Sequence, residues 1–445
     1  MPDRPLVIIH GWSDSYVSFK RLGRLLRDAG VTRDIRHVHL GNYLSLDDAV
    51  TFTDLREALA RAWVREGLPT APRSVDAVVH STGGLVIRDW LSHFYAPDAV
   101  PLHHLLMLAP ANFGSPLAHK GRSFLGRVVK GWKGEKPFQT GTHILKGLEL
   151  ASPFSWALAE RDRFGARVYY GPGRVLCTVL VGNTGYRGIS AAANEDGSDG
   201  TVRIATANLN GVLVEADFTG DPEQPVAYRM KPSRGATAFG IMAGENHSTV
   251  AAKDGGPNNP STLPFITRAL TVTDAEFPAW CAELDTLSAA VMEVTATADP
   301  ATHGYQNTVF LLQDQYGDHV GDYFLEFYVD DDDAGWFAGM FHRDAISSVH
   351  TYGDDRAYRS VYVDCTTLFQ RLDRFTEVMR ISLTAMPEFR LTGSAGYRTW
   401  TDDDIGSIRM KLPQVRKLFQ ANRTVLVRTT IHRHQANRVF EFKPV

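Results

Sequence analysis

Residues 75–86 restrict the fold more than any other part of this sequence. Residues 75–79 read Val-Asp-Ala-Val-Val, which predicts a buried strand, and the apolar residues after Gly84 recur at helical spacing. Ser81 lies between the two patterns and is followed closely by Gly83 and Gly84. We therefore expect a strand, a very sharp turn and a helix, with the serine in a strained backbone conformation and the glycines letting the helix pack close to the strand.

Strand and helix patterns alternate through the first half of the chain. Alternation of this kind predicts a mostly parallel sheet with helices on both faces. Ligands of open α/β sheets bind beyond the carboxyl ends of the strands, so residues that directly follow the strands are candidates for a functional site. The expected elements are strands over 6–9, 35–40, 75–79 and 102–109 and helices over 19–26 and 55–68.

Three reactive side chains follow strand-like runs. Ser81, Asp199 and His247 occur in this order along the chain, each in a loop after an apolar run. The order Ser, Asp, His is that of a serine nucleophile, an orienting carboxylate and a general base on an α/β sheet. Asp196, in the same loop as Asp199, is the alternative carboxylate.

These motifs together resemble the α/β-hydrolase superfamily, in particular its bacterial lipase, esterase and GPI-inositol-deacylase-like branch. The resemblance covers about the first 260 residues and includes an apolar strand ending in His-Gly-Trp at 10–12 and a Gly-Ser-Pro loop at 114–116. By family position, it implies that the backbone amides of Trp12 and Thr82 form the oxyanion hole. The Asp-Gly-Thr-Val motif that begins at Asp199 is similar to the acid-bearing loop of these lipases, which favours Asp199 over the alternative.

Residues 119–134 give an indication of the class of substrate. Their pattern predicts an amphipathic helix with Phe124, Val128 and Trp132 on the apolar face and basic residues elsewhere. Such a helix is either a lid that contacts lipid or a surface helix packed on the domain, and both interpretations stay open.

With the resemblance, this pattern favours a lipase or phospholipase-like enzyme that cleaves lipid acyl esters through an acyl-enzyme and contacts membrane surfaces transiently. The alternatives are a short-chain or polyester esterase, an acyltransferase, and a weakly catalytic binding or interaction protein on a hydrolase scaffold.

The chain changes character near residue 285. Its 445 residues exceed what one core organises, and beyond residue 290 alternating, aromatic-rich runs separated by Gly- and Asp-containing turns predict a β-sandwich. We expect an α/β-hydrolase catalytic domain over 1–285, with a lid-like insertion near 112–150, and a β-sandwich-like accessory domain over 286–445. The accessory domain is expected to bind a protein partner or lipid, or to shield the hydrolase.

The charge balance gives no global attraction to nucleic acid. Lysine and arginine total 47 residues against 50 acidic residues, for a net charge of -3. The first strand pattern begins within the first ten residues and leaves no room for a signal peptide, so we expect a cytoplasmic protein or one exported by a signal-peptide-independent route.

Neither a cofactor nor a metal site is expected. The acidic runs at 330–333 and 402–404 offer carboxylates that calcium could bind, but such runs are typical of solvated turns, and His432 and His434 lack a third ligand. The three cysteines are widely spaced, without metal-ligand spacing, and we expect free thiols at Cys177, Cys281 and Cys365.

Replacing Phe124 and Trp132 with serine is expected to lower activity on aggregated substrate far more than activity on a monomeric ester, because a lid's apolar face is needed only at a lipid surface. Hydrolysis of one p-nitrophenyl ester in soluble and in detergent-dispersed form measures both activities. Equal losses on the two forms would exclude the lid.

Overall fold

The computed structural model describes most of the chain and divides it into two compact units. The first unit comprises residues 1–211 and 233–304, and the second comprises residues 212–232 and 305–445. The described residues are 4–9, 19–31, 34–38, 49–118, 141–188, 191, 194–221, 223–295, 299–329, 335–372, 378–385 and 406–432.

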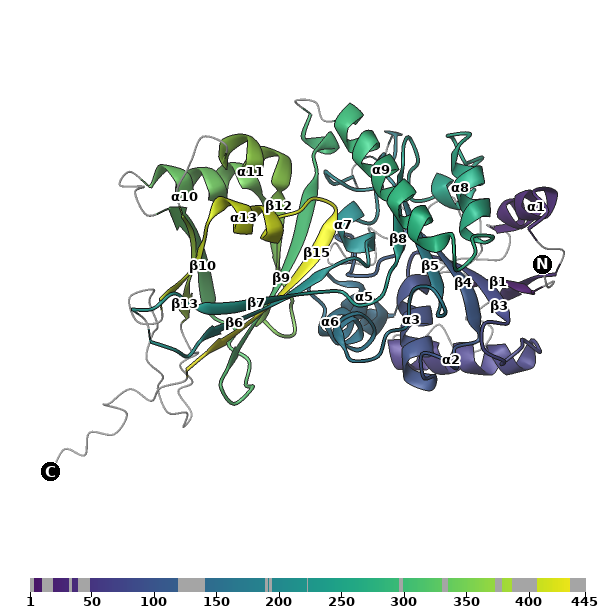
Figure 1. Ribbon diagram of the computed structural model, residues 1–445, viewed down its shortest axis with the longest axis horizontal. Coiled ribbons are helices and arrows are strands. Elements are labelled where there is room, and N and C mark those ends of the chain that lie inside the picture. Colours follow the sequence, from purple (N-terminus) through teal and green to yellow (C-terminus); the bar gives the residue numbers. More distant parts are fainter. Residues whose placement is uncertain are drawn as a thin grey trace, which may run out of the picture. The chain divides into compact units, whose positions relative to one another are not determined.

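The first unit is built on a six-stranded sheet in which every neighbouring pair is parallel. The strand order is β2-β1-β3-β4-β5-β8 (Figure 1). The three strands β3, β4 and β5 are buried along their whole lengths, as expected for parallel strands that are covered on both faces. The strands are β1 (Leu6–Ile9), β2 (Ile35–Val38), β3 (Val75–His80), β4 (Leu102–Leu108), β5 (Leu176–Gly182) and β8 (Ala238–Met242).

Helices cover both faces of this sheet, which confirms the predicted α/β architecture. On one face lie α1 (Lys20–Asp28), α8 (Thr262–Ala269) and α9 (Phe277–Thr295), whose fully buried Trp280 belongs to the core on that side (Figure 1). On the other face lie α2 (Phe52–Arg65) and α3 (Gly83–Phe94), joined by Trp63 and Trp90 with ring centroids 4.5 Å apart. Shorter helices are α5 (Thr142–Leu148), α6 (Pro153–Ala159), the π-helical turn η3 (Glu160–Phe164) and α7 (Ile204–Ala207).

The second unit consists of two packed sheets, as predicted. One sheet is mixed, with the order β11-β12-β9-β15-β6-β7, and the other is antiparallel, with the order β10-β13-β14. Apolar side chains of both sheets form one core, and a cavity of about 30 Å³ within it is too small for an acyl chain. The strands are β6 (Val212–Phe218), β7 (Ala227–Pro232), β9 (Tyr305–Asp314), β10 (Tyr323–Val329), β11 (Ile346–Thr351), β12 (Tyr358–Asp364), β13 (Met379–Ala385), β14 (Ser407–Met410) and β15 (Arg423–Ile431).

The division into units differs from the single boundary expected at residues 285 and 286. That position lies inside α9, and the contact boundary follows residue 304. In addition, the β6–β7 hairpin leaves the first unit and joins the sheet of the second, where β6 pairs in parallel with β15. The pairing links residues more than 200 positions apart, so the local pattern of β6 carries no sign of it.

Arg163 of η3 holds the two chain segments from which this hairpin emerges. The fully buried guanidinium donates to the carbonyl oxygens of Leu209 (3.0 Å) and Arg234 (3.0 Å) and to the Ser233 hydroxyl (3.1 Å). Burial lowers the pKa of Arg163 from its ordinary value. The segments that lead into and out of the β6–β7 hairpin are thus held in place within the first unit.

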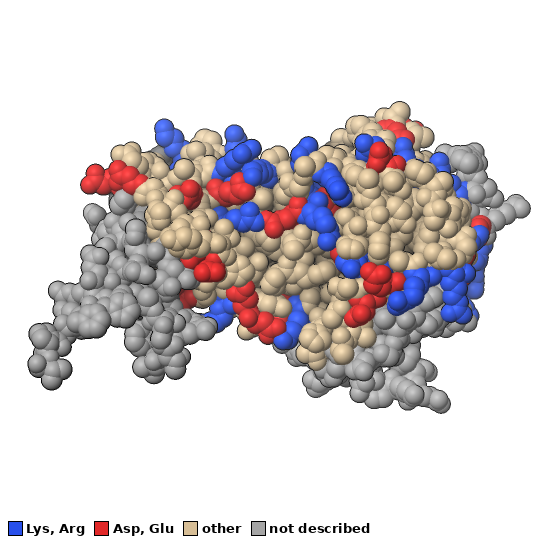
Figure 2. Space-filling model, turned by 90° about the horizontal axis from the view of Figure 1, so that it is seen from below, with Lys and Arg blue, Asp and Glu red and all other residues tan. Residues whose placement is uncertain are grey.

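The surface and the cysteines agree with the predictions from composition. Basic and acidic side chains are interspersed over the described part of the face in Figure 2. All three cysteines are free, and burial raises the pKa of Cys177 to about 12 and that of Cys281 to about 11, so these thiols are protonated at neutral pH. Among the described residues, helices that combine enough length and apolar character to cross a membrane are absent.

A buried ion pair joins α3 to η3. Both side chains are fully buried, and Arg88 donates to the two Asp162 oxygens at 2.8 and 2.9 Å, while the Tyr170 hydroxyl donates to the same carboxylate at 2.9 Å. Burial lowers the pKa of Arg88, but the charge and hydrogen bonds of Asp162 outweigh burial, and the net pKa is raised.

Replacing Asp162 with asparagine is expected to lower the free energy of unfolding of the first unit by about 3 kcal/mol or more, because Arg88 would remain buried without a counter-charge. Urea unfolding followed by circular dichroism measures the change. The matched control is Glu283→Gln, which breaks an exposed ion pair with Arg268 and should cost less than about 1 kcal/mol. Equal effects of the two changes would contradict the expectation.

Candidate functional site

Ser81 occupies the turn between β3 and α3 in the strained conformation that its sequence predicts. Its φ of 55° is in the left-handed region, which residues other than glycine rarely adopt. The turn is held by backbone hydrogen bonds from the Ser81 amide to the Leu108 carbonyl (3.2 Å) and from the Ala111 amide to the Ser81 carbonyl (3.3 Å). A side chain at Gly84 would place its Cβ 2.7 Å from the Cβ of Pro110, so glycine is required for α3 to start against this loop.

The amide of Thr82 lies at the start of α3, directly after the serine. Thr82 is the N-cap residue, and amides at the start of a helix have no acceptor within the helix. The helix dipole adds partial positive charge at this end, so the position suits a developing anion. Trp12, the other expected oxyanion donor, lies outside the described residues, as do Phe124, Val128 and Trp132 of the expected lid.

The structure pairs His247 with Asp199. His247 Nδ1 lies 3.0 Å from Asp199 Oδ2, and the His247 amide donates to the Asp199 carbonyl at 3.0 Å. Asp199 is fully buried, and its other oxygen accepts from the amides of Thr201 (3.0 Å) and Val202 (2.8 Å). An ionised carboxylate only accepts, so Nδ1 carries the proton and Nε2 keeps a lone pair. Of the two candidate carboxylates, Asp199 and not Asp196 is bonded to this histidine.

The loop that carries Asp199 is fixed by its own ion pair. Arg203 donates to both oxygens of Glu195 at 2.6 and 3.0 Å, across the base of the loop. Gly200 has a φ of +93°, and a Cβ there would approach the Tyr186 ring to 2.7 Å. The carboxylate therefore sits in a loop that has little freedom to move.

His80 connects the serine turn to the histidine loop. Its Nε2 lies 2.9 Å from the His247 carbonyl oxygen, and the two imidazole rings are 4.6 Å apart between centroids. The Lys253 ammonium is 3.3 Å from His80 Nδ1. Since an ammonium only donates, Nδ1 accepts, and Nε2–H donates to His247. His80 therefore hydrogen-bonds the loop that carries His247 and joins it to the serine turn.

Glu245 is a supporting residue that the sequence did not reveal. It is fully buried beneath the histidine loop, and its carboxylate accepts from the Asn259 amide and the Thr262 hydroxyl, both at 2.8 Å. These partners follow 14 and 17 residues later in the chain. No local pattern connects them to a glutamate two positions before His247.

The strand order places these groups along one edge of the sheet. Ser81 follows β3, the Asp199 loop follows β5, and the His247 loop follows β8, and the carboxyl ends of parallel strands meet at the same edge. The arrangement offers a strained serine, an imidazole with a free Nε2 lone pair, a buried carboxylate and a helix amino terminus.

Comparisons with known proteins identify the fold of the chain. No model of a known protein family matches the chain, and no curated protein matches it. The chain is similar in structure to phospholipase PlaB from Legionella pneumophila, with 24% identity and a TM-score of 0.79 over 99% of this chain and 97% of that one. A structure of PlaB in complex with thio-NAD matches with 24% identity and a TM-score of 0.78, over 99% and 96% of the two chains. The likeness establishes the expected fold, an α/β-hydrolase unit combined with a β-sandwich-like unit.

Proposed function

We propose that this protein is a serine hydrolase that cleaves carboxylic esters through an acyl-enzyme, with Ser81 as nucleophile, His247 as general base and Asp199 as the orienting carboxylate. The observation that carries the proposal is the hydrogen bond between His247 and Asp199 at the sheet edge that also bears the strained Ser81. His80 supports it, because this direct neighbour of Ser81 is hydrogen-bonded to the backbone of His247.

In the proposed reaction, Ser81 Oγ attacks the ester carbonyl carbon while His247 Nε2 accepts the hydroxyl proton. Asp199 stabilises the resulting imidazolium through Nδ1–H. The tetrahedral oxyanion is bound by the amide of Thr82 and, by family position, that of Trp12. Collapse expels the alcohol, which takes the proton from His247, and water then attacks the acyl-enzyme by the same steps and releases the acid and free Ser81.

A lipid acyl ester is the proposed substrate. Two independent observations support this choice: the sequence resembles the lipase, esterase and GPI-inositol-deacylase-like branch, and the chain is similar over nearly its full length to a structure named as a phospholipase. We propose a lipase or phospholipase-like activity without a cofactor and with transient membrane contact. The second unit is proposed to bind lipid at its surface or a protein partner, since the cavity of about 30 Å³ in its core is too small for an acyl chain.

Ser81→Ala and His247→Ala are each expected to lower hydrolysis by at least about 10³-fold, because either change removes the nucleophile or its base. The measurement is initial-rate hydrolysis of p-nitrophenyl esters from acetate to palmitate and of dispersed phospholipid, by purified full-length protein. Long-chain and phospholipid activity that depends on both residues supports the proposal. A silent wild type, or activity that survives Ser81→Ala, contradicts it.

The two aspartates of one loop provide a matched pair. Asp199→Asn is expected to reduce the rate by about 10²- to 10⁴-fold, because an amide holds His247 in the wrong tautomer, whereas Asp196→Asn should change it only a few-fold. The same ester assay and thermal melting of both variants separate a catalytic loss from misfolding. Equal rate losses in two folded variants would overturn the assignment of Asp199.

A further inference from the structure

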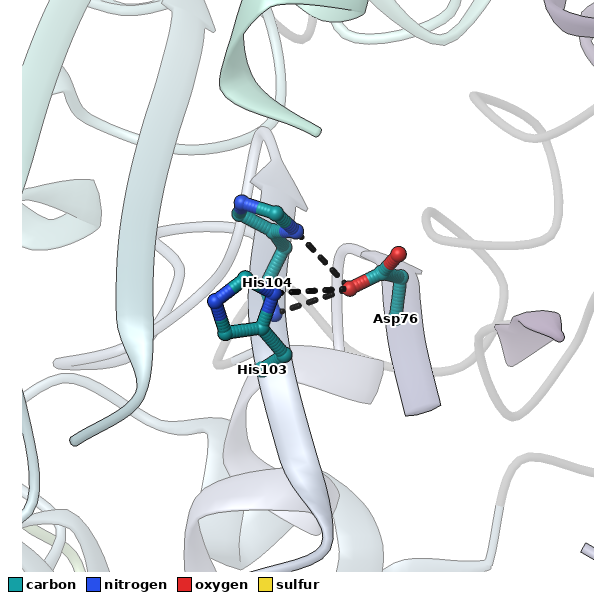
Figure 3. A group of neighbouring side chains, drawn as sticks. All are labelled: Asp76, His103 and His104. Atoms are coloured by element: carbon teal, nitrogen blue, oxygen red, sulfur yellow. Dashed lines mark hydrogen bonds and ion pairs between the residues drawn. The ribbon is translucent and has the colours of Figure 1, made fainter. Parts of the chain in front are cut away.

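A cluster of three buried side chains lies at the opposite edge of the sheet from Ser81. Asp76 is the second residue of β3, and His103 and His104 are near the start of β4 (Figure 3). Their ligand atoms lie within 4.8 Å of one another. Asp76 and Ser81 are five residues apart on an extended strand, roughly 16 Å. The cluster is therefore separate from the proposed catalytic groups.

An irregularity in strand pairing explains how two adjacent histidines meet one carboxylate. Neighbouring side chains of a regular strand point to opposite faces of the sheet. The pairing of β3 with β4 shifts register between Val75 and Ala77, so that Asp76 lies opposite both His103 and His104. Such a bulge redirects a side chain, and Figure 3 shows both rings directed toward Asp76. The ring centroids are 4.1 Å apart.

The hydrogen bonds of His104 place a positively charged species between it and Asp76. His104 Nε2 lies 2.8 Å from the Val272 carbonyl oxygen, which only accepts, so Nε2 carries a proton. His104 Nδ1 lies 2.8 Å from Asp76 Oδ1, which is also an acceptor. If the His104 ring were neutral, the lone pair of Nδ1 would face the carboxylate oxygen of Asp76, and neither atom could donate a hydrogen bond. Either a second proton or a metal ion resolves this conflict.

His103 distinguishes between these two solutions. Its buried Nδ1 has no hydrogen-bond partner among the described residues and lies 3.7 Å from the same Asp76 Oδ1, beyond hydrogen-bonding distance. This nitrogen, the Asp76 carboxylate oxygen and a His104 ring nitrogen all lie within 4.8 Å of one another. A proton shared by Asp76 and His104 leaves His103 Nδ1 without a partner among the described residues, whereas a metal ion engages all three side chains.

We propose that Asp76, His103 and His104 bind one transition-metal ion, for which zinc is the best match. Two imidazoles and one carboxylate are a common set of three protein ligands for zinc. A tetrahedral zinc with bonds of about 2.0–2.2 Å holds its ligand atoms roughly 3.3–3.6 Å apart, so the distances of 2.8 and 3.7 Å from Asp76 Oδ1 to the two Nδ1 atoms need shifts of roughly half an ångström.

The surroundings of the cluster suit such a site. The bond from His104 to the Val272 carbonyl has the form by which zinc-binding histidines are oriented. Side-chain exposures of 12% for Asp76 and 11% for His103 let water complete the coordination. The nearby Arg4 and Arg73 oppose a cation, but Asp274 accepts two hydrogen bonds of 2.8 Å from Arg73 and neutralises the charge of Arg73. The ion would join β3 to β4 directly and, through the bond from His104 to Val272, would join both strands to the turn before α9.

The test is metal binding by purified full-length protein without an affinity tag. Chelator-treated wild type is expected to bind about one Co²⁺ per chain with the visible absorption of a tetrahedral site, and one Zn²⁺ should displace it. Zinc should also raise the Tm of the wild type. His103→Gln is expected to weaken binding at least about tenfold and to abolish the rise in Tm.

His93→Gln is the matched control, because His93 is exposed on α3 in the same unit. It should titrate like the wild type. Absence of cobalt absorption in the wild type would overturn the proposal without reference to any variant. Identical titrations for the wild type and a folded His103→Gln would also overturn it, and would leave a proton shared by Asp76 and His104 as the alternative.

Discussion

The parallel pairing of β3 with β1 and β4 is the constraint on which the proposed site depends. It buries β3 completely, including Val79, which stands two residues before Ser81. A serine at a φ of 55° costs of order 1–3 kcal/mol and persists only when its surroundings fix it. Here β4 and the loop after it do so, through Leu108 and Ala111 on either side of the turn. The sheet thus stabilises the strained backbone conformation that places Ser81 at its edge.

The groups around this edge are held from several independent directions. Glu195 and Arg203 fix the loop of Asp199, while Glu245 fixes the chain beneath His247. His80 joins the histidine loop to the serine turn. Each support is a hydrogen bond or ion pair between parts of the chain brought together by the sheet, and preorganisation of this kind is what acyl transfer requires.

Local patterns predicted much of this arrangement. Two kinds of feature were sufficient. One is the short sequence around Ser81, with a β-branched run before it and glycines after it, and the other is the order of Ser81, Asp199 and His247 along the chain. The structure agrees with the strained turn and with the pairing of His247 with Asp199. Contacts that depend on distant pairing could not be predicted. Asp76 meets two histidines only because of a shift in strand register, and β6 gives no local sign that its partner is β15.

The β6–β7 hairpin has a consequence for how this protein can be divided or can have arisen. A fragment ending near residue 304 would retain residues 212–232 but lack β15, the strand beside β6, and would present an unpaired strand edge to other chains. A fragment beginning at residue 305 would lack two strands of its own sheet. The two units therefore cannot be separated at a single peptide bond. A simple terminal gene fusion does not account for such an architecture, because residues 233–304 of the first unit separate β6 from β15 along the chain.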